Sequence, residues 1–189
     1  MSLPATFKIE EKELESDYTE LKEAETRLRI LSDFITGNSY WTGDVRKNEK
    51  RVPVRKRDNE TIDLSELGFG KYGADKVNTF IAAVVWNYQT NKIELFETDK
   101  FSIISDIWGL EQDPDWGDTK RYDISIKKTG TGKETRYKVD PKPAKPVIPE
   151  ILAACKSKYI NLQALFGNGN PFKQPDSESV ANDALNALK

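Results

Sequence analysis

The sequence contains no histidine and only one cysteine, Cys155, among its 189 residues. Without an imidazole, the chain cannot form a Ser-His or Cys-His nucleophile pair or a histidine-liganded metal site. A single cysteine excludes an intramolecular disulfide and a thiolate zinc cluster. An apolar run of about 20 residues, as a membrane-spanning helix requires, is also missing, and so is the apolar core of a signal peptide. We therefore expect a soluble, cytoplasmic protein without a cofactor or a membrane partner.

The length and composition favour one domain with extensions over two full domains. Only 37% of the residues are hydrophobic and 32% are charged, so part of the chain is expected to lie outside the core. The predicted organisation is an acidic N-terminal arm or helix (1–26), a central domain (27–146), a C-terminal helical extension (147–172) and a flexible tail (173–189).

Charge is unevenly distributed along the chain, although 29 Lys and Arg residues nearly balance 31 Asp and Glu residues. Residues 27–57 and 119–146 each carry a net charge of +6, whereas residues 1–26 carry −5 and residues 93–118 carry −7. A single charged block is commonly a solvated surface. Two basic blocks that are far apart in sequence and both rich in aromatic residues favour a shared anionic partner.

Five segments have the apolar pattern of β-strands. They are residues 27–31, 77–88, 93–98, 122–129 and 135–139. The second segment is apolar on both faces, which predicts a central strand. Thr36-Gly37-Asn38 has the composition of a turn. We expect a long functional loop over residues 38–76, with a short strand at 52–57.

One helix is predicted between the third and fourth of these strands. Residues 100–110 carry apolar side chains at helical spacing, and Asp99 precedes them as a candidate N-cap. This order of elements is that of an OB-fold, an open Greek-key barrel. The sequence therefore predicts a mainly β, five-stranded OB-fold barrel with N- and C-terminal helical extensions. An SH3-like barrel and a small α+β sheet are the alternatives.

Aromatic residues lie among the basic residues of both blocks, a combination that suits single-stranded nucleic acid. Bases stack on aromatic rings, at about 1–3 kcal/mol per base, while Lys and Arg neutralise phosphates. The candidates for stacking are Tyr40, Trp41, Trp86, Tyr88 and Tyr137. The candidates for phosphate contact are Arg46, Lys47, Lys50, Arg51, Arg55, Arg57, Lys127, Lys128, Arg136 and Lys138. A place in the core is the alternative for these aromatic residues, above all for Trp86.

Two further patterns resemble catalytic motifs only superficially. The segment Gly130-Thr-Gly-Lys133 lacks the leading glycine of a phosphate-binding loop, so it predicts a hairpin turn. Asp113, Asp115 and Asp118 could hold Mg²⁺ as in a nuclease, but carboxylates beside Pro and Gly are typical of turns. A magnesium-dependent nuclease is therefore the least favoured function.

Several short motifs between about residues 27 and 172 are distinctive as a set. They are Arg29-Ile-Leu-Ser32, Ile35-Thr-Gly37, Tyr40-Trp41, Pro53-Val-Arg55, Phe80–Tyr88, Asp115-Trp-Gly-Asp118, Tyr122-Asp-Ile-Ser-Ile126, Leu165-Phe166 and Asn170-Pro-Phe172. Taken together, these motifs resemble those of a family of phage single-stranded DNA-binding proteins. These proteins are related in fold to the T-even phage helix-destabilising protein.

The resemblance implies an OB-fold that coats and protects single-stranded DNA in phage DNA replication, recombination and repair, without enzymatic activity. It also implies phage replication or recombination proteins as partners, self-association along DNA, and the host-cell cytoplasm as location. The T-even type carries a structural zinc, which a chain with no histidine and one cysteine cannot copy. Residues 173–189 carry a net charge of only −1, unlike the acidic tails with which such proteins often end.

We expect the DNA to lie in a groove between the 40–57 loop and the 120–138 hairpin. The acidic segment 93–118 is expected to face away from it, because like charges beside the phosphates oppose binding. The alternative from another functional class is a protein-interaction or virion assembly module whose basic loops dock an acidic partner.

Overall fold

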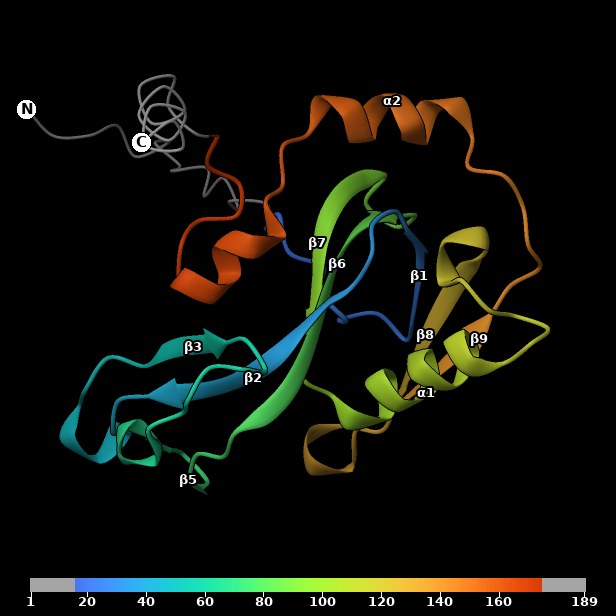
Figure 1. The fold of residues 1–189 in the computed structure, drawn as a ribbon. Coiled ribbons are helices and arrows are strands. Elements are labelled where there is room, and N and C mark those ends of the chain that lie inside the picture. Colours follow the sequence, from blue (N-terminus) through green and yellow to red (C-terminus); the bar gives the residue numbers. More distant parts are fainter. Residues whose placement is uncertain (1–15, 175–189) are drawn as a thin grey trace, which may run out of the picture.

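The sheet is organised around β6 (Asn78–Asn87), which the sequence predicted to be a central strand. In the computed structural model, which describes residues 16–174, β6 has three neighbours. β2 (Ile35–Thr42) and β1 (Glu25–Ile30) pair with successive halves of one edge of β6, and β7 (Lys92–Thr98) pairs with the other edge. The prediction of a central strand is therefore confirmed (Figure 1).

Seven strands form one antiparallel sheet in the order β3-β2-β6-β1-β8-β9, with β7 beside β6. The remaining strands and α-helices are β3 (Val52–Lys56), β4 (Phe69–Gly70), β5 (Gly73–Ala74), β8 (Asp123–Thr129), β9 (Arg136–Pro141), α1 (Phe101–Gln112) and α2 (Pro149–Ser157). β4 and β5 form a separate pair. The large sheet is not closed into a barrel, so the prediction of a five-stranded OB-fold barrel is wrong. The helix placement is also wrong, because α1 follows the seventh strand of the chain and not the third.

A glycine in β2 explains why the turn predicted at residues 36–38 is instead part of a strand. Thr36-Gly37-Asn38 lies within β2, where a Cβ atom at Gly37 would collide with the Lys56 carbonyl and the Phe166 ring. Glycine therefore permits a close approach here and does not make a turn. Residues 52–56 then fold back as β3, antiparallel to β2, and this pair extends away from the other strands (Figure 1).

The two faces of β6 pack against different parts of the chain because successive side chains of a strand alternate. Ile81 and Val85 belong to a core cluster that includes residues of α1. On the opposite face, Phe80 packs near the 3-10 helix Leu162–Gly167, and Trp86 packs against α2. The sheet is thus covered on both sides.

Residues 16–24 form an extended arm and not a helix. Asp17–Thr19 run beside the middle of β7, where two backbone hydrogen bonds of 2.9 Å join this segment to Leu95. This pairing covers part of the sheet edge that β7 would otherwise expose. The rest of the predicted arm, residues 1–15, and residues 175–189 of the tail lie outside the described part of the chain. No helix within residues 16–174 is long and apolar enough to cross a membrane.

Candidate nucleic-acid interface

A groove of about 460 Å³ lies between the β2–β3 pair, the end of β7 and β9, and we call it the Trp41 groove. Trp41, Pro53 and Arg55 line it from the first basic block, and Tyr137 lines it from the second. Residues 18–22 of the N-terminal arm complete its wall. Segments from the two basic blocks, nearly 100 residues apart in sequence, thus meet at one surface.

Trp41 has the most open aromatic ring of this groove among the stacking candidates. It lies opposite Pro53, is 43% exposed, and has the Arg51 guanidinium 5.5 Å from its ring centroid. The adjacent residue, Tyr40, is buried, and its hydroxyl donates a hydrogen bond of 2.8 Å to Glu66. Burial, reinforced by this bond to a carboxylate, raises the pKa of Tyr40 to about 12. Trp41, and not Tyr40, therefore presents a ring face to the groove.

Tyr137 reaches the groove from β9 and is half-buried against the core cluster that contains α1 residues. Arg136 and Lys138 flank it in the strand, and their side chains therefore lie on the other face. The Lys138 side chain is 68% exposed and lies 4.0 Å from Asp106. The Arg136 guanidinium donates to two nearby backbone carbonyls. These two cations thus point away from the groove that Tyr137 lines.

Trp86 and Tyr88 do not line the Trp41 groove. Trp86 is only 6% exposed and packs with Ile151 of α2, so it occupies the core position that was its alternative. The Tyr88 hydroxyl donates to Asp123 at 3.1 Å, and the Arg27 guanidinium lies 4.9 Å from the Tyr88 ring centroid. Of the five stacking candidates, the groove gathers Tyr40, Trp41 and Tyr137.

Three arginines of the first basic block are each bound to one carboxylate through two guanidinium nitrogens. The pairs are Arg46–Asp44, Arg51–Asp75 and Arg55–Glu97. The hydrogen bond from Arg46 is the main cause that lowers the pKa of Asp44 to about 2. A one-to-one pair carries no net charge, so these arginines attract phosphate less than the charge count of their block indicates.

The other phosphate candidates are spread over several surfaces. Arg57 lies over an aromatic ring of the Leu162–Gly167 helix, 4.6 Å from its centroid. Lys127 is 2.7 Å from a carboxylate of β9, and the Lys128 ammonium donates at 3.2 Å to a backbone carbonyl of the N-terminal arm. Lys47 and Lys50 lie on an exposed turn beyond the end of β2.

The groove also contains residues that the charge pattern did not predict there. Glu97 and Asp99 line it, so the expectation that segment 93–118 faces away from the groove is wrong at these positions. Lys100, the single cation of that segment, and Tyr18 of the N-terminal arm line it too. No sequence signal could have found Tyr18, because its place follows from the pairing of the arm with β7.

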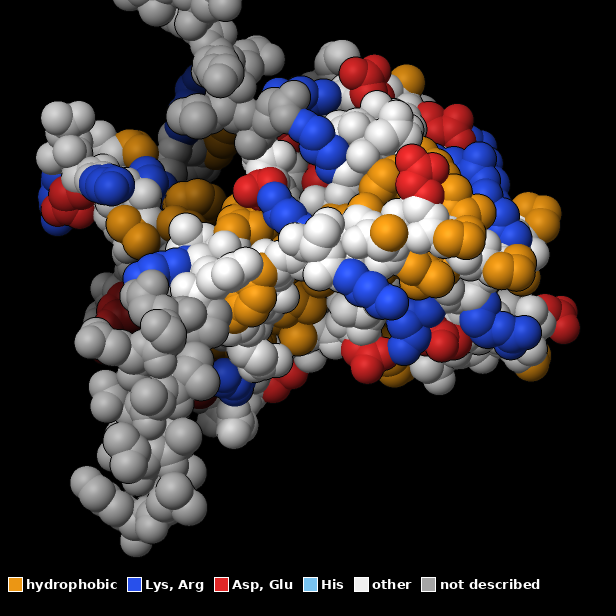
Figure 2. All heavy atoms as spheres, turned by 90° about the horizontal axis from the view of Figure 1, so that it is seen from above, with side chains coloured by type: hydrophobic (Ala, Val, Ile, Leu, Met, Phe, Trp, Pro, Cys, Tyr) orange, Lys and Arg blue, Asp and Glu red, His pale blue; other side chains and the backbone are white. Residues whose placement is uncertain are grey.

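A second, more apolar cleft of about 510 Å³ lies between α1 and the beginning of β2 and β6. Ile104 and Trp108 line it, and Trp108 is 66% exposed. Phe101, one turn before Ile104, is 82% exposed. A separate apolar patch covers α2, where Ile148 and Leu152 are about half exposed and basic side chains border the hydrophobic ones (Figure 2). Exposed aromatic residues next to an apolar cleft are typical of protein contact surfaces.

Asp113, Asp115 and Asp118 do not gather into a metal site. The Asp113 carboxylate accepts the Asp115 backbone N–H at 2.8 Å, and Asp118 accepts that of Lys120 at 2.9 Å. Both are therefore turn-capping residues. Across residues 16–174, no group of three Cys, Asp or Glu side chains is placed to hold a metal ion.

The chain was also compared with known proteins. No family model, no curated protein and no solved structure matches it.

Proposed function

We propose that this protein binds single-stranded DNA in the Trp41 groove with little sequence preference, and that it coats and protects DNA in phage replication, recombination and repair. The observation that supports this most strongly is the exposed Trp41 ring beside a guanidinium in a groove shared by both basic blocks. A base of any identity can stack on such a ring. The proposal involves no enzymatic step, and it includes self-association along the strand in the host-cell cytoplasm.

Ion pairing within the first basic block limits the electrostatic part of this binding. If five cations released counterions, the logarithm of the affinity would fall with the logarithm of salt concentration at a slope of about −3 to −4. Because Arg46, Arg51 and Arg55 are already paired, we expect about two released counterions and a slope of about −1.4. Titration of fluorescent oligo-dT at several salt concentrations measures this slope.

The Trp41→Ala variant tests the site directly. Loss of one stacked base is expected to weaken oligo-dT binding by about 1–3 kcal/mol. Trp108→Ala is the matched control, because it removes another exposed tryptophan from α1, outside the groove. Equal affinities of wild type and Trp41→Ala, or tighter binding of duplex than of oligo-dT, would contradict the proposal.

Protein docking is the second candidate function, and the apolar cleft beside α1 favours it. Trp108 and Phe101 lie on α1, which packs on the sheet, yet both side chains are largely exposed. A partner at this cleft would require apolar contacts, whereas the sequence pattern indicated basic loops docking an acidic partner. Wild-type protein that fails to bind oligo-dT at low salt would favour this second function over the first.

A further inference from the structure

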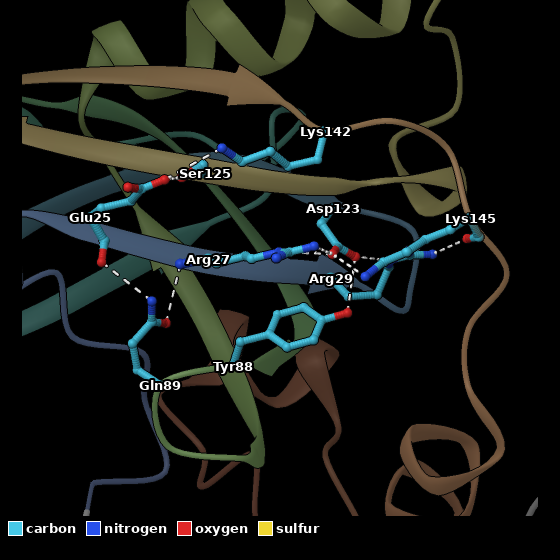
Figure 3. A network of polar contacts seen from close by, with 9 residues as sticks. All are labelled: Glu25, Arg27, Arg29, Tyr88, Gln89, Asp123, Ser125, Lys142 and Lys145. Atoms are coloured by element: carbon cyan, nitrogen blue, oxygen red, sulfur yellow. Dashed lines mark hydrogen bonds and ion pairs between the residues drawn. The ribbon is translucent and has the colours of Figure 1, made fainter.

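Asp123, at the start of β8, is a fully buried carboxylate that three cations share (Figure 3). Arg29 donates to it at 2.5 Å, Arg27 at 2.6 and 2.9 Å, and the Lys145 ammonium lies 3.0 Å away. Burial of Asp123 acts to raise its pKa, but the hydrogen bonds from these cations outweigh burial and lower it. One negative and three positive side chains leave a formal excess of two positive charges.

Arg29 has an unused hydrogen-bond donor in this cluster. Its side chain is 1% exposed, Nε is bonded to Asp123, and Nη1 donates to the Lys145 carbonyl at 2.9 Å. Nη2 is buried and has no hydrogen-bond partner. A buried donor without a partner costs free energy, and the cost is larger for a charged group. A water molecule could accept the bond, but a neutral acceptor would leave the excess charge in place.

A pocket of about 370 Å³ adjoins the same guanidinium. Four cationic residues line it, and the extended segment 144–147 forms one side. The four are Arg29, Lys120, Arg121 and Lys145. Lys120 is paired with Asp33. Arg121 is exposed, so the lining runs from a buried guanidinium to one at the surface.

We infer that this pocket binds a phosphate dianion, either free phosphate or the terminal phosphate of a nucleic-acid strand. A dianion matches the formal excess of two positive charges around Asp123 and gives Arg29 Nη2 an acceptor. Guanidinium groups bind phosphate oxygens through short charge-assisted hydrogen bonds. An internal phosphodiester carries only one negative charge and matches the excess less well. The site shares no lining residue with the Trp41 groove, and only its strand-end form rests on the proposed function.

Calorimetric titration of the full chain with sodium phosphate tests the site, with sodium chloride at the same ionic strength as reference. We expect saturable binding of phosphate and a phosphate-dependent rise of the melting temperature that chloride does not reproduce. Arg121→Ser should weaken phosphate binding about tenfold, as loss of one charge-assisted bond implies. Arg136→Ser removes an exposed arginine from β9, outside the pocket, and should leave phosphate affinity unchanged.

A second titration distinguishes the two sources of phosphate. If a strand end is the ligand, 5′-phosphorylated oligo-dT should bind about tenfold more tightly than 5′-hydroxyl oligo-dT, and Arg121→Ser should abolish the difference. Equal binding of the two oligonucleotides, with free phosphate still bound, assigns the pocket to free phosphate. The inference is overturned if phosphate, like chloride, shows no saturable binding and no rise of the melting temperature. It is also overturned if Arg121→Ser and Arg136→Ser weaken phosphate binding equally. Failure of oligo-dT to bind at all would count against the Trp41 groove alone.

Discussion

The arginines beside the Trp41 groove and those around Asp123 are both bound to carboxylates, but in different ratios. Each of Arg51 and Arg55 has a carboxylate of its own. Around Asp123, two arginines and a lysine share one carboxylate that has no exposed surface. The first arrangement neutralises a basic segment, whereas the second concentrates positive charge in a small volume. Net charge per segment, which is +6 for both basic blocks, cannot distinguish these cases.

Removing the shared carboxylate should have the largest effect on stability. Asp123→Asn leaves Arg29 buried without a counter-charge, which is expected to cost about 3–5 kcal/mol of unfolding free energy. Urea denaturation measures the loss. Asp75→Asn, which breaks the one-to-one pair with the partly exposed Arg51, should cost clearly less. Similar losses in the two variants would show that sharing a carboxylate makes no energetic difference.

Removing the carboxylate that pairs with Arg55 alone should strengthen DNA binding. Glu97→Gln frees Arg55 at the wall of the groove and adds one unit of positive charge there. We expect tighter oligo-dT binding at low salt and a salt slope steeper by about 0.7. Glu150→Gln removes the same charge from α2, away from the groove, and serves as control. If both variants bind oligo-dT equally well, the Arg55–Glu97 pair does not limit the affinity.

The smallest effect concerns the dependence of stability on pH. The pKa of Asp44 falls from its usual 3.8 to about 2 in the folded chain, chiefly because Arg46 donates to it. The folded state therefore holds the proton more weakly than the unfolded state, so this contribution to stability is complete above about pH 4 and is lost as the pH falls toward 2. Asp44→Asn should flatten the stability curve in that range in urea denaturation. Asp115→Asn, on the exposed turn after α1, should keep the wild-type slope.

Local patterns of the sequence predicted three of the strands closely, but they missed β2 and the way the strands join. The apolar runs at 77–88, 93–98 and 122–129 became β6, β7 and β8 with boundaries shifted by at most one residue. The apolar pattern within each segment identifies such strands without reference to the strands that pair with them. Closure of a barrel depends instead on which edges meet, and no local pattern encodes that.

The candidate site was predictable in its residue types and not in its electrostatics. Trp41 and Tyr137 were named from composition, and both line the groove. The carboxylates that neutralise Arg51 and Arg55 are 24 and 42 residues further along the chain. Asp75 directly follows β5 and Glu97 lies in β7, so both pairs form only when the chain folds, and charge counts over a contiguous segment overlook them.

The position of β1 has a consequence for synthesis of the chain. Leu28 lies opposite Asn87 on one side and Ile124 on the other. β1 leaves the ribosome before both of its neighbours, and the second neighbour follows only after nearly 100 further residues. Pairing between such distant segments is slow, and unpaired strand edges are prone to aggregate in the meantime. A nascent chain that ends before β8 thus presents β1 as an open edge, so chaperone demand should be greatest at that stage of translation.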